Sequence, residues 1–201
     1  MTTALFIVIG YLSGSITWGY WLVRVFRHED IRTQGSGNIG ATNVWRVHGR
    51  KVGVPAVLLD TAKGLVPTLI ATKVAGHDVG ALTGAAAMVG HWRPIFLKFQ
   101  KGGKMVATAA GAFLGLAPIV GGLSAGVWLI VFGATRYASV ASIVSAAMLP
   151  FWSWLVGYPW PVTVFAAVAG VGVILLHRAN IRRLLRGEEN RFTRTRPAAS
   201  P

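Results

Sequence analysis

The chain has 201 residues, of which 53% are hydrophobic and 13% charged, with 25 glycines and no cysteine. This composition is too apolar for an ordinary soluble domain, and the lack of cysteine excludes disulfides and cysteine-ligated zinc. The formal net charge of +14 would suit a nucleic-acid-binding protein, but nearly all Lys and Arg residues lie at the ends of apolar segments or in the C-terminal region. That distribution is typical of a membrane protein, and we expect no nucleic acid among its partners.

Long apolar segments predict an all-α fold that crosses a membrane several times. A backbone inside a bilayer must satisfy its own hydrogen bonds, and about 20 apolar helical residues are needed to cross it. We therefore expect a polytopic integral membrane protein with seven transmembrane helices. The expected helices cover residues 3–24, 53–75, 81–97, 104–119, 121–134, 139–156 and 162–177.

The first expected helix ends at Arg24 and Arg27, which indicates that its C-terminal end faces the cytoplasm and the N-terminus lies outside. Gly10 and Gly14 have the spacing of small residues at a close helix–helix contact. The basic loop that follows, residues 27–51, is expected on the cytoplasmic side.

Within this loop, the segment GSGNIGATNVWR at residues 35–46 is the longest break in the apolar sequence. Its glycines allow left-handed backbone conformations, and its amides and hydroxyls offer several ligands to one anion. The spelling G-x-G-x-x-G also occurs in dinucleotide-binding proteins, but no strand precedes it and no βαβ pattern follows, so we reject that function. Two interpretations remain: one wall of a phosphate-binding site, or a plain flexible loop.

The second expected helix carries Asp60 and Lys63, which lie on one helical face and are predicted to pair. Ionisable groups within a span usually face a protein interior or a watery cavity. After a short outer turn at 76–80, the third expected helix leads into a second polar segment, GHWRPIFLKFQKGGK at residues 90–104. This segment is not a Walker phosphate loop, because Lys98 stands where that motif needs a glycine.

Residues 105–134 are too long for one span, and Pro118 with the Gly121–Gly122 pair predicts a break between two short helices. Two spans here also keep the basic C-terminal region in the cytoplasm. Arg136 lies in a short inner turn that follows them. Aromatic residues between 152 and 160 then indicate the outer interface.

The C-terminal region carries the third polar segment. Residues 177–192 predict a basic amphipathic helix on the inner surface, in which Glu189 is expected to order the basic residues. We expect residues 1–192 to form a single membrane domain and residues 193–201 to form a disordered basic tail.

All three polar segments fall on the expected inner side, and together they hold many anion ligands and few acids. Hydroxyls and amides accompany the cations and could orient polar substrate groups. No carboxylate cluster accompanies the scattered histidines, so we expect no metal site and no cofactor. The cations are Arg46, Lys104, Arg136 and His177, and the polar neutral groups are Ser36, Ser142, Asn38, Asn43 and Asn180.

These segments resemble the three motifs of a known family, the bacterial acyl-phosphate-dependent glycerol-3-phosphate acyltransferases, or PlsY family. The matching segments are GSGNIGATNVWR at 35–46, GHWRPIFLKFQKGGK at 90–104 and HRANIRRLLRGEE at 177–189. Shorter matches occur at 14–16, 60–64 and 135–143, so the resemblance extends over residues 14–192. Two departures stand out: Met105 replaces the glycine that usually follows GGK, and Thr17-Trp18 replace Pro-Phe.

The resemblance implies a multi-pass enzyme of the cell (inner, plasma) membrane whose active site faces the cytoplasm. Such an enzyme transfers a fatty acyl group from acyl phosphate to the 1-hydroxyl of sn-glycerol 3-phosphate, which gives lysophosphatidic acid and phosphate, the first step of phospholipid biosynthesis. Its partners would be acyl phosphate, sn-glycerol 3-phosphate and membrane lipids, and it would need no cofactor.

The resemblance also implies roles for particular residues. The glycerol phosphate would be bound by Lys104, His177 and Asn180, with help from Arg46 and Ser142, while residues 36–43 would hold phosphate and polarise the acyl carbonyl. The expected catalytic residues are Ser36, Arg46, Lys104 and His177. The expected substrate-binding residues are Gly35, Gly37, Asn38, Gly40, Thr42, Asn43, Gly102, Gly103, Ser142 and Asn180.

Several alternatives stay open. His177 is either a general base or only a phosphate ligand, in which case a bound phosphate accepts the hydroxyl proton. Ser36 as a covalent nucleophile is a minor mechanism. Outside enzymology, a transporter of phosphorylated metabolites would need polar groups at the membrane midplane and ideally an inverted repeat, and a lipid-binding scaffold would lack turnover.

Overall fold

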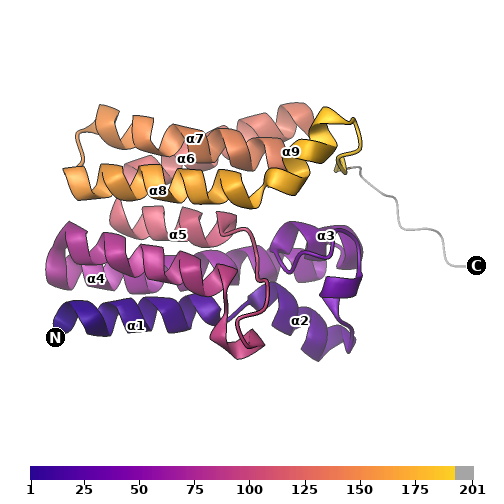
Figure 1. The fold of residues 1–201 in the computed structure, drawn as a ribbon, viewed down its shortest axis with the longest axis horizontal. Helices are drawn as coiled ribbons and strands as arrows, with labels where there is room; N and C mark the ends of the chain where they lie inside the picture. Colours follow the sequence, from indigo (N-terminus) through magenta and orange to yellow (C-terminus); the bar gives the residue numbers. More distant parts are fainter. Residues whose placement is uncertain (193–201) are drawn as a thin grey trace, which may run out of the picture.

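The expected all-α fold is confirmed by the computed structural model, which describes residues 1–192 and contains no strand among them (Figure 1). The predicted disordered tail, residues 193–201, lies outside the described residues. Two short 3₁₀ turns interrupt the loops, η1 (Ile31–Thr33) and η2 (Ile95–Leu97). The helices are α1 (Thr2–Ser15), α2 (Trp18–Arg27), α3 (Ala41–His48), α4 (Arg50–Trp92), α5 (Val106–Leu116), α6 (Pro118–Thr135), α7 (Ala138–Val156), α8 (Trp160–Leu176) and α9 (Arg178–Leu185).

The expected helix 3–24 is broken in the structure, because α1 ends at Ser15 and α2 begins at Trp18. The break is held from a distant part of the chain: the Lys63 ammonium donates to the carbonyl of Ile16 (2.8 Å), and the Trp18 amide donates to Asp60 (3.3 Å). A break inside an apolar segment is stable when other groups satisfy the freed backbone atoms.

The expected second and third spans form one long element, α4, which is bent back on itself. Its only non-helical residue is Gly76, with φ 84° and ψ 177°, a conformation that suits glycine. Residues 50–75 and 77–92 are therefore two arms of a helical hairpin. The predicted outer turn at 76–80 shrinks to this single residue, and the second arm ends at Trp92 rather than at residue 97.

The two arms pack side by side and antiparallel, as the pairs of contacting residues show. A side chain on Gly84 would meet Thr68, and the His91 ring is 2.7 Å from the Lys63 ammonium. Residue numbers thus fall along the first arm as those of the contacting residues rise along the second. Glycines permit equally close contacts elsewhere, since a side chain on Gly14 of α1 would overlap Ala87 of the second arm.

The break predicted between residues 104 and 134 exists, but it falls at Ala117 rather than after residue 119. Pro118 is the first residue of α6, a position where its missing N–H costs no hydrogen bond. Gly121 lies inside α6, where it packs against the backbone of Leu114. The first of the two helices, α5, has only 11 residues.

The amphipathic helix expected at 177–192 is shorter in the structure, where α9 ends at Leu185 and is bent by 55° from α8. Gly187, with a φ of 71°, turns the chain back so that residues 188–192 cross toward α6 and α7. The amide of Phe192 donates to the carbonyl of Arg136 at 2.8 Å.

Within residues 1–192, four helical segments are long and apolar enough to cross a membrane, and the bent pair α8–α9 would make a fifth. The outer faces of these helices expose large apolar side chains such as Leu58, Ile130 and Trp154, which is the pattern of a lipid-facing surface. The short helices α2, α3 and α9 lie at one end of the bundle (Figure 1). The three polar segments of the sequence meet at this end.

Candidate active site

A cavity of about 580 Å³ lies between α3, both arms of α4 and helices α5 to α9. One part of its wall is basic and polar, and the rest is almost wholly apolar. The polar wall includes Ser36, Asn38, Thr42, Arg46, Lys104, Ser142, His177, Asn180, Arg183 and Glu189. The apolar wall includes Val57, Val106, Ala109, Phe113, Ala125, Leu129, Phe132, Ala146 and Leu149.

The glycine-rich loop is organised by one buried amide, Asn43. Its Nδ2 donates to the carbonyls of Gln34 (3.0 Å) and Asn38 (2.9 Å), and its Oδ1 accepts from the amide of Ser36 (2.9 Å). The Gly40 amide in turn donates to Asn38 Oδ1 at 2.8 Å. These backbone amides are therefore used to hold the loop, and the group that Ser36 presents to the cavity is its hydroxyl.

Gly35 and Gly37 do not line the cavity. Both have positive φ, 57° and 67°, and a side chain on Gly35 would overlap the amide of Asn43. Their role is thus to let the loop turn tightly around Asn43.

Helix α3 brings two further groups to the polar wall, Thr42 from its first turn and Arg46 from its last. The first N–H groups of a helix have no acceptor within it, so the start of α3 can donate to an anion. Burial lowers the pKa of Arg46, and its buried Nε has no hydrogen-bond partner in the part of the chain that the structure describes. A partly buried guanidinium with an unused donor is suited to bind a phosphate or carboxylate.

Lys104 lies in the loop that precedes α5. Its ammonium donates to Asn180 Oδ1 at 2.6 Å, which leaves its other N–H donors for a ligand. Burial is the main cause that lowers its pKa to about 8, and the nearby cations Arg183, Lys101 and Arg46 act in the same direction.

Gly102 and Gly103, expected to bind phosphate, do not line the cavity. Their amides donate to the carbonyls of Trp92 (2.9 Å) and His91 (3.0 Å), and Gly103 lies directly against the His91 ring. They position Lys104, which follows them, instead of facing a ligand.

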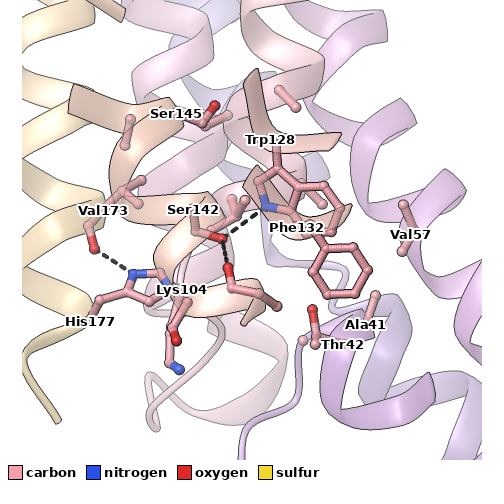
Figure 2. A pocket seen from close by; sticks show the side chains of 18 of the residues that line it. Ala41, Thr42, Val57, Lys104, Trp128, Phe132, Ser142, Ser145, Val173 and His177 are labelled. Carbon is pink, nitrogen blue, oxygen red and sulfur yellow. Dashed lines mark hydrogen bonds between the residues drawn. The ribbon is translucent and has the colours of Figure 1, made fainter. Parts of the chain in front are cut away.

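His177 ends α8 and is almost fully buried, at 3% exposure. Its Nδ1 lies 2.8 Å from the carbonyl oxygen of Val173, which can only accept, so Nδ1 carries the proton. In the neutral ring Nε2 is then an unprotonated acceptor. Figure 2 shows the imidazole between Val173 and Lys104 at the polar end of the cavity.

Glu189 joins three elements around this end of the cavity. One carboxylate oxygen accepts from Ser139 of α7 (2.8 Å) and from Asn180 of α9 (2.7 Å), and the other accepts from Arg183 (2.7 Å). Burial raises the pKa of Glu189, but these hydrogen bonds outweigh it and the net pKa is lowered. Through Asn180 the carboxylate also sets the position of Lys104.

Ser142 lies farther into the cavity, beside an aromatic wall (Figure 2). Its hydroxyl donates to the carbonyl of Ala138 (2.7 Å) and accepts from the Trp128 indole (3.1 Å). The Trp128 and Phe132 rings are stacked at 4.8 Å, and Phe132 also meets Phe192 edge to face. The hydroxyl is thus engaged in the protein, and the rings next to it prolong the apolar wall.

The structure thus brings most of the predicted site residues to one cavity, although they come from distant parts of the chain. Four predicted glycines lie behind its wall: Gly35, Gly37, Gly102 and Gly103. The residues at the cavity are Ser36, Asn38, Gly40, Thr42, Asn43, Arg46, Lys104, Ser142, His177 and Asn180.

Other cavity residues were not expected from the sequence, namely Arg183 and the aromatic residues Trp128, Phe132 and Phe192. Arg183 is one of several arginines in α9, and nothing in the sequence distinguishes it from its neighbours. Among residues 1–192, no group of three or more His, Asp or Glu side chains could hold a metal ion.

Comparisons with known proteins agree with this architecture. The family model for glycerol-3-phosphate acyltransferase matches residues 4–187. The chain is 44% identical over 192 residues to the glycerol-3-phosphate acyltransferase of Desulforudis audaxviator, with 94% of this chain and 96% of that protein covered. It is 46% identical over 192 residues to that of Aquifex aeolicus, with 94% and 99% covered.

Two solved structures are also similar. One is the glycerol 3-phosphate form of PlsY, an integral membrane glycerol 3-phosphate acyltransferase, with a TM-score of 0.92, 43% identity and 96% of each chain covered. The other is its lysophosphatidic acid form, with a TM-score of 0.89, 42% identity and the same coverage. The chain is thus an integral membrane protein that belongs to the glycerol-3-phosphate acyltransferase family.

Proposed function

We propose that this membrane acyltransferase takes its acyl group from acyl phosphate and transfers it to the 1-hydroxyl of sn-glycerol 3-phosphate, giving lysophosphatidic acid and phosphate as the first step of phospholipid biosynthesis. The observation that carries the proposal is a single cavity with a basic wall at one end and an apolar wall over the rest. Such a cavity suits a donor with a phosphate head and an acyl tail, and a water-soluble acceptor that is itself a phosphate.

The phosphate of the acceptor binds between Lys104 and Arg46, whose remaining donors have no partner among residues 1–192. Two charge-assisted hydrogen-bond donors with different geometry can hold a dianion firmly. Asn180 and Ser142 assist by orienting Lys104 and by bounding the site. The segment 36–43 holds the phosphate of the donor through the Ser36 hydroxyl and the start of α3.

The acyl chain lies along the apolar wall between α5, α6 and α7. Ala109 and Ala146 are small and leave room there, while Phe113 and Leu149 bound the deep end. Burial of each methylene group contributes about 0.8 kcal/mol, so a long chain is held strongly without any polar contact.

In the reaction, the acceptor oxygen forms a bond to the carbonyl carbon and the bond from that carbon to the phosphate oxygen breaks, with its electron pair leaving on the phosphate. The hydroxyl proton passes to His177 Nε2 as general base and then to the leaving phosphate. A bound phosphate that takes the proton directly is the alternative, in which His177 is only a ligand.

Replacement of His177 by Gln separates the two roles of this residue. Gln provides an acceptor near the position of Nε2 but cannot take up a proton. A fall of about 100-fold or more in kcat would support the base, whereas a loss confined to the acceptor KM would reject it.

Ser36 as a covalent nucleophile has less support, because no hydrogen bond joins its hydroxyl to a histidine in residues 1–192. A covalent route would leave an acyl-enzyme when acceptor is withheld. Mass spectrometry of active enzyme incubated with acyl phosphate alone would detect it.

We further propose seven spans, in which both arms of α4 and the short α5 each cross the membrane, with the N-terminus outside and the site in the cytoplasm of a cell bounded by this inner membrane. The basic loops at the end of the bundle that holds the cavity support this orientation. The chain contains no cysteine, so Asp78→Cys and Lys101→Cys can be labelled singly in intact cells. Only the first should react with an impermeant maleimide.

The function is tested with purified protein and labelled glycerol 3-phosphate, supplied with acyl phosphate or with acyl-CoA. Lysophosphatidic acid is expected with acyl phosphate only. Formation of lysophosphatidic acid with acyl-CoA but not with acyl phosphate would overturn the donor assignment. Uptake of glycerol 3-phosphate into vesicles without any product would point to a transporter.

A further inference from the structure

Next to the polar wall lies a second cluster of ionisable groups that the proposed reaction does not use: Asp60, Lys63 and His91. Asp60 and His91 reach the wall of the cavity, and Lys63 lies behind them. Their exposures are 1%, 5% and 3%, which is far below the usual exposure of charged groups. The Lys63 ammonium contacts Asp60 Oδ1 at 2.8 Å and His91 Nδ1 at 2.7 Å. Ionisable residues within a span usually have a function, because their burial is costly.

The cluster is closed with respect to hydrogen bonds. Lys63 has three N–H donors, and they go to Asp60, to His91 and to the carbonyl of Ile16 at 2.8 Å. Because an ammonium only donates, His91 Nδ1 must accept, and the neutral ring carries its proton on Nε2. The cluster has no donor of Lys63 left for a substrate, so it does not act as a second anion site.

His91 connects this cluster to the loop that carries Lys104. Its backbone carbonyl accepts from the amide of Gly103 at 3.0 Å, and Gly103 lies so close to the imidazole that no side chain would fit. The ring is therefore the surface on which the loop rests. One residue further on, the Lys104 ammonium reaches Asn180.

We infer that Asp60, Lys63 and His91 form a positioning device for Lys104. Asp60 holds Lys63, and Lys63 holds the His91 ring through Nδ1. The ring fixes the position of Gly103, and Gly103 in turn fixes where the Lys104 ammonium meets the phosphate. The inference rests on the proposed role of Lys104 in binding glycerol 3-phosphate, and it assigns positioning residues that lie outside the binding groups.

The test compares two variants of the full-length protein, His91→Leu and His91→Asn. Leu has no acceptor for Lys63, whereas the Asn carbonyl can take the place of Nδ1. The measurements are the Kd for glycerol 3-phosphate by calorimetry without donor, and KM and kcat with donor. His91→Leu should raise Kd and KM about tenfold or more and leave kcat within about threefold, since a binding group is misplaced in ground and transition state alike. His91→Asn should recover a large part of the affinity.

Ser153→Ala is the control for a purely structural effect. Ser153 is fully buried and shares a hydrogen bond of 2.8 Å with Thr163, away from the cavity. This variant should lower the Tm without changing the Kd. If His91→Leu does not fold, Asp60→Asn combined with Lys63→Met gives the same test, because it removes the donor to His91 and leaves no unpaired charge.

Two results would overturn the inference: a Kd in His91→Leu within about twofold of the parent, or an equal loss in His91→Leu and His91→Asn. Lys104→Gln separates this failure from a failure of the proposed function. If Lys104→Gln leaves the Kd unchanged, the binding role of Lys104 is wrong. If it raises the Kd and His91→Leu does not, only the positioning role is wrong.

Discussion

Two buried polar clusters lie on either side of one loop, and they differ in how completely their hydrogen bonds are made. In the cluster of Asp60, Lys63 and His91, each donor of the ammonium has a partner in the protein. In the cluster around Lys104, which we call the open cluster, the ammonium at the cavity wall donates to Asn180 and has no other hydrogen-bond partner among residues 1–192. Unpaired polar groups are costly when buried, so the second cluster is complete only when a ligand supplies the acceptors.

The hydrogen bonds that each cluster leaves unmade indicate which charged residues bind the substrate. Charge alone would select both clusters, since both contain a lysine that is at least partly buried. The count of unused donors selects Lys104, together with Arg46 and its unpaired Nε. The closed cluster then has to be explained by what it holds in place, which is the break between α1 and α2 and the loop before Lys104.

Lys104→Gln removes the cation of the open cluster and should have the largest effect. We expect kcat/KM for glycerol 3-phosphate to fall about 100-fold or more, because truncating one partner of a buried charge pair costs about 2–5 kcal/mol. Steady-state kinetics with varied acceptor measure the loss. The matched control is Lys101→Gln, an exposed lysine of the same loop that does not line the cavity. Equal losses of kcat/KM in the two variants would show that activity depends on positive charge near the site in general and not on a specific contact of Lys104.

The overall fold could be predicted from the sequence to the extent that it depends on local hydropathy. The apolar segments and the break before Pro118 could be read directly. The break at Thr17 could not, because it is stabilised by Asp60 and Lys63, more than 40 positions away, and not by any signal near residue 17. A pattern of apolar residues favours a continuous helix there, and a tertiary contact overrides it.

The candidate site, too, could be predicted from the sequence only in part. The sequence indicates which residue types can bind phosphate, so Arg46 and Lys104 were identifiable. It does not show which groups are already used within the protein. Residues 36–43 were expected to hold phosphate and polarise the acyl carbonyl, but the Ser36 amide donates to the Asn43 side chain instead, and that competition depends on geometry alone.

A second prediction concerns Glu189→Gln, which removes hydrogen bonds from the open cluster but keeps its cation, Lys104. In Glu189→Gln, the single amide oxygen cannot accept from Asn180 and Ser139 on one side and from Arg183 on the other, so the cluster loses at least one hydrogen bond and the charge that strengthens the rest. We expect the acceptor KM to rise about tenfold and the free energy of unfolding to fall by about 1.5–3 kcal/mol, the value of a hydrogen bond to a charged group. The control is Glu188→Gln, since Glu188 is exposed.

The stability loss in Glu189→Gln should depend on pH in a defined direction. The pKa of Glu189 is lowered in the folded protein, since hydrogen bonds from Asn180, Ser139 and Arg183 outweigh the effect of burial. Its contribution is therefore complete above the unfolded pKa of about 4.3 and is lost as the pH falls through the folded pKa. Thermal unfolding of the parent and the variant should differ at neutral pH and converge at acid pH. A constant difference would contradict the assignment.

A third prediction uses the titration of Lys104 itself, whose pKa is lowered to about 8 mainly by burial; Glu189 opposes this shift and the neighbouring cations add to it. Phosphate binds the ammonium, so affinity for glycerol 3-phosphate should be full below about pH 8 and decline above it. Simple titration of one group predicts a Kd about fivefold higher at pH 9 than at pH 8. Lys104→Arg should abolish this decline, because arginine stays charged throughout. Calorimetry at both pH values gives the result, and a decline that persists in Lys104→Arg would assign it to another group.

The smallest expected effect concerns Met105, the residue after Lys104. Replacing it tests whether side-chain packing or an unstrained backbone matters more for holding the loop of the open cluster. Met105 has a φ of 66°, a conformation that glycine adopts without strain, yet its side chain is buried at 7% exposure in the apolar core. Met105→Gly relieves about 1 kcal/mol of strain but forfeits about 2–5 kcal/mol of buried side chain. The net loss should lower the Tm by roughly 3–8 °C, with the acceptor KM within about threefold because Asn180 still holds Lys104.

Met105→Leu is the matched control, since it keeps both the apolar volume and the strained backbone and should cost less than about 1.5 kcal/mol. A higher Tm in Met105→Gly than in the parent would mean that strain outweighs packing at this position. The loop would then be held chiefly by the hydrogen bonds of Gly102 and Gly103 to the second arm of α4, and the closed cluster would contribute more to the position of Lys104 than the core around Met105 does.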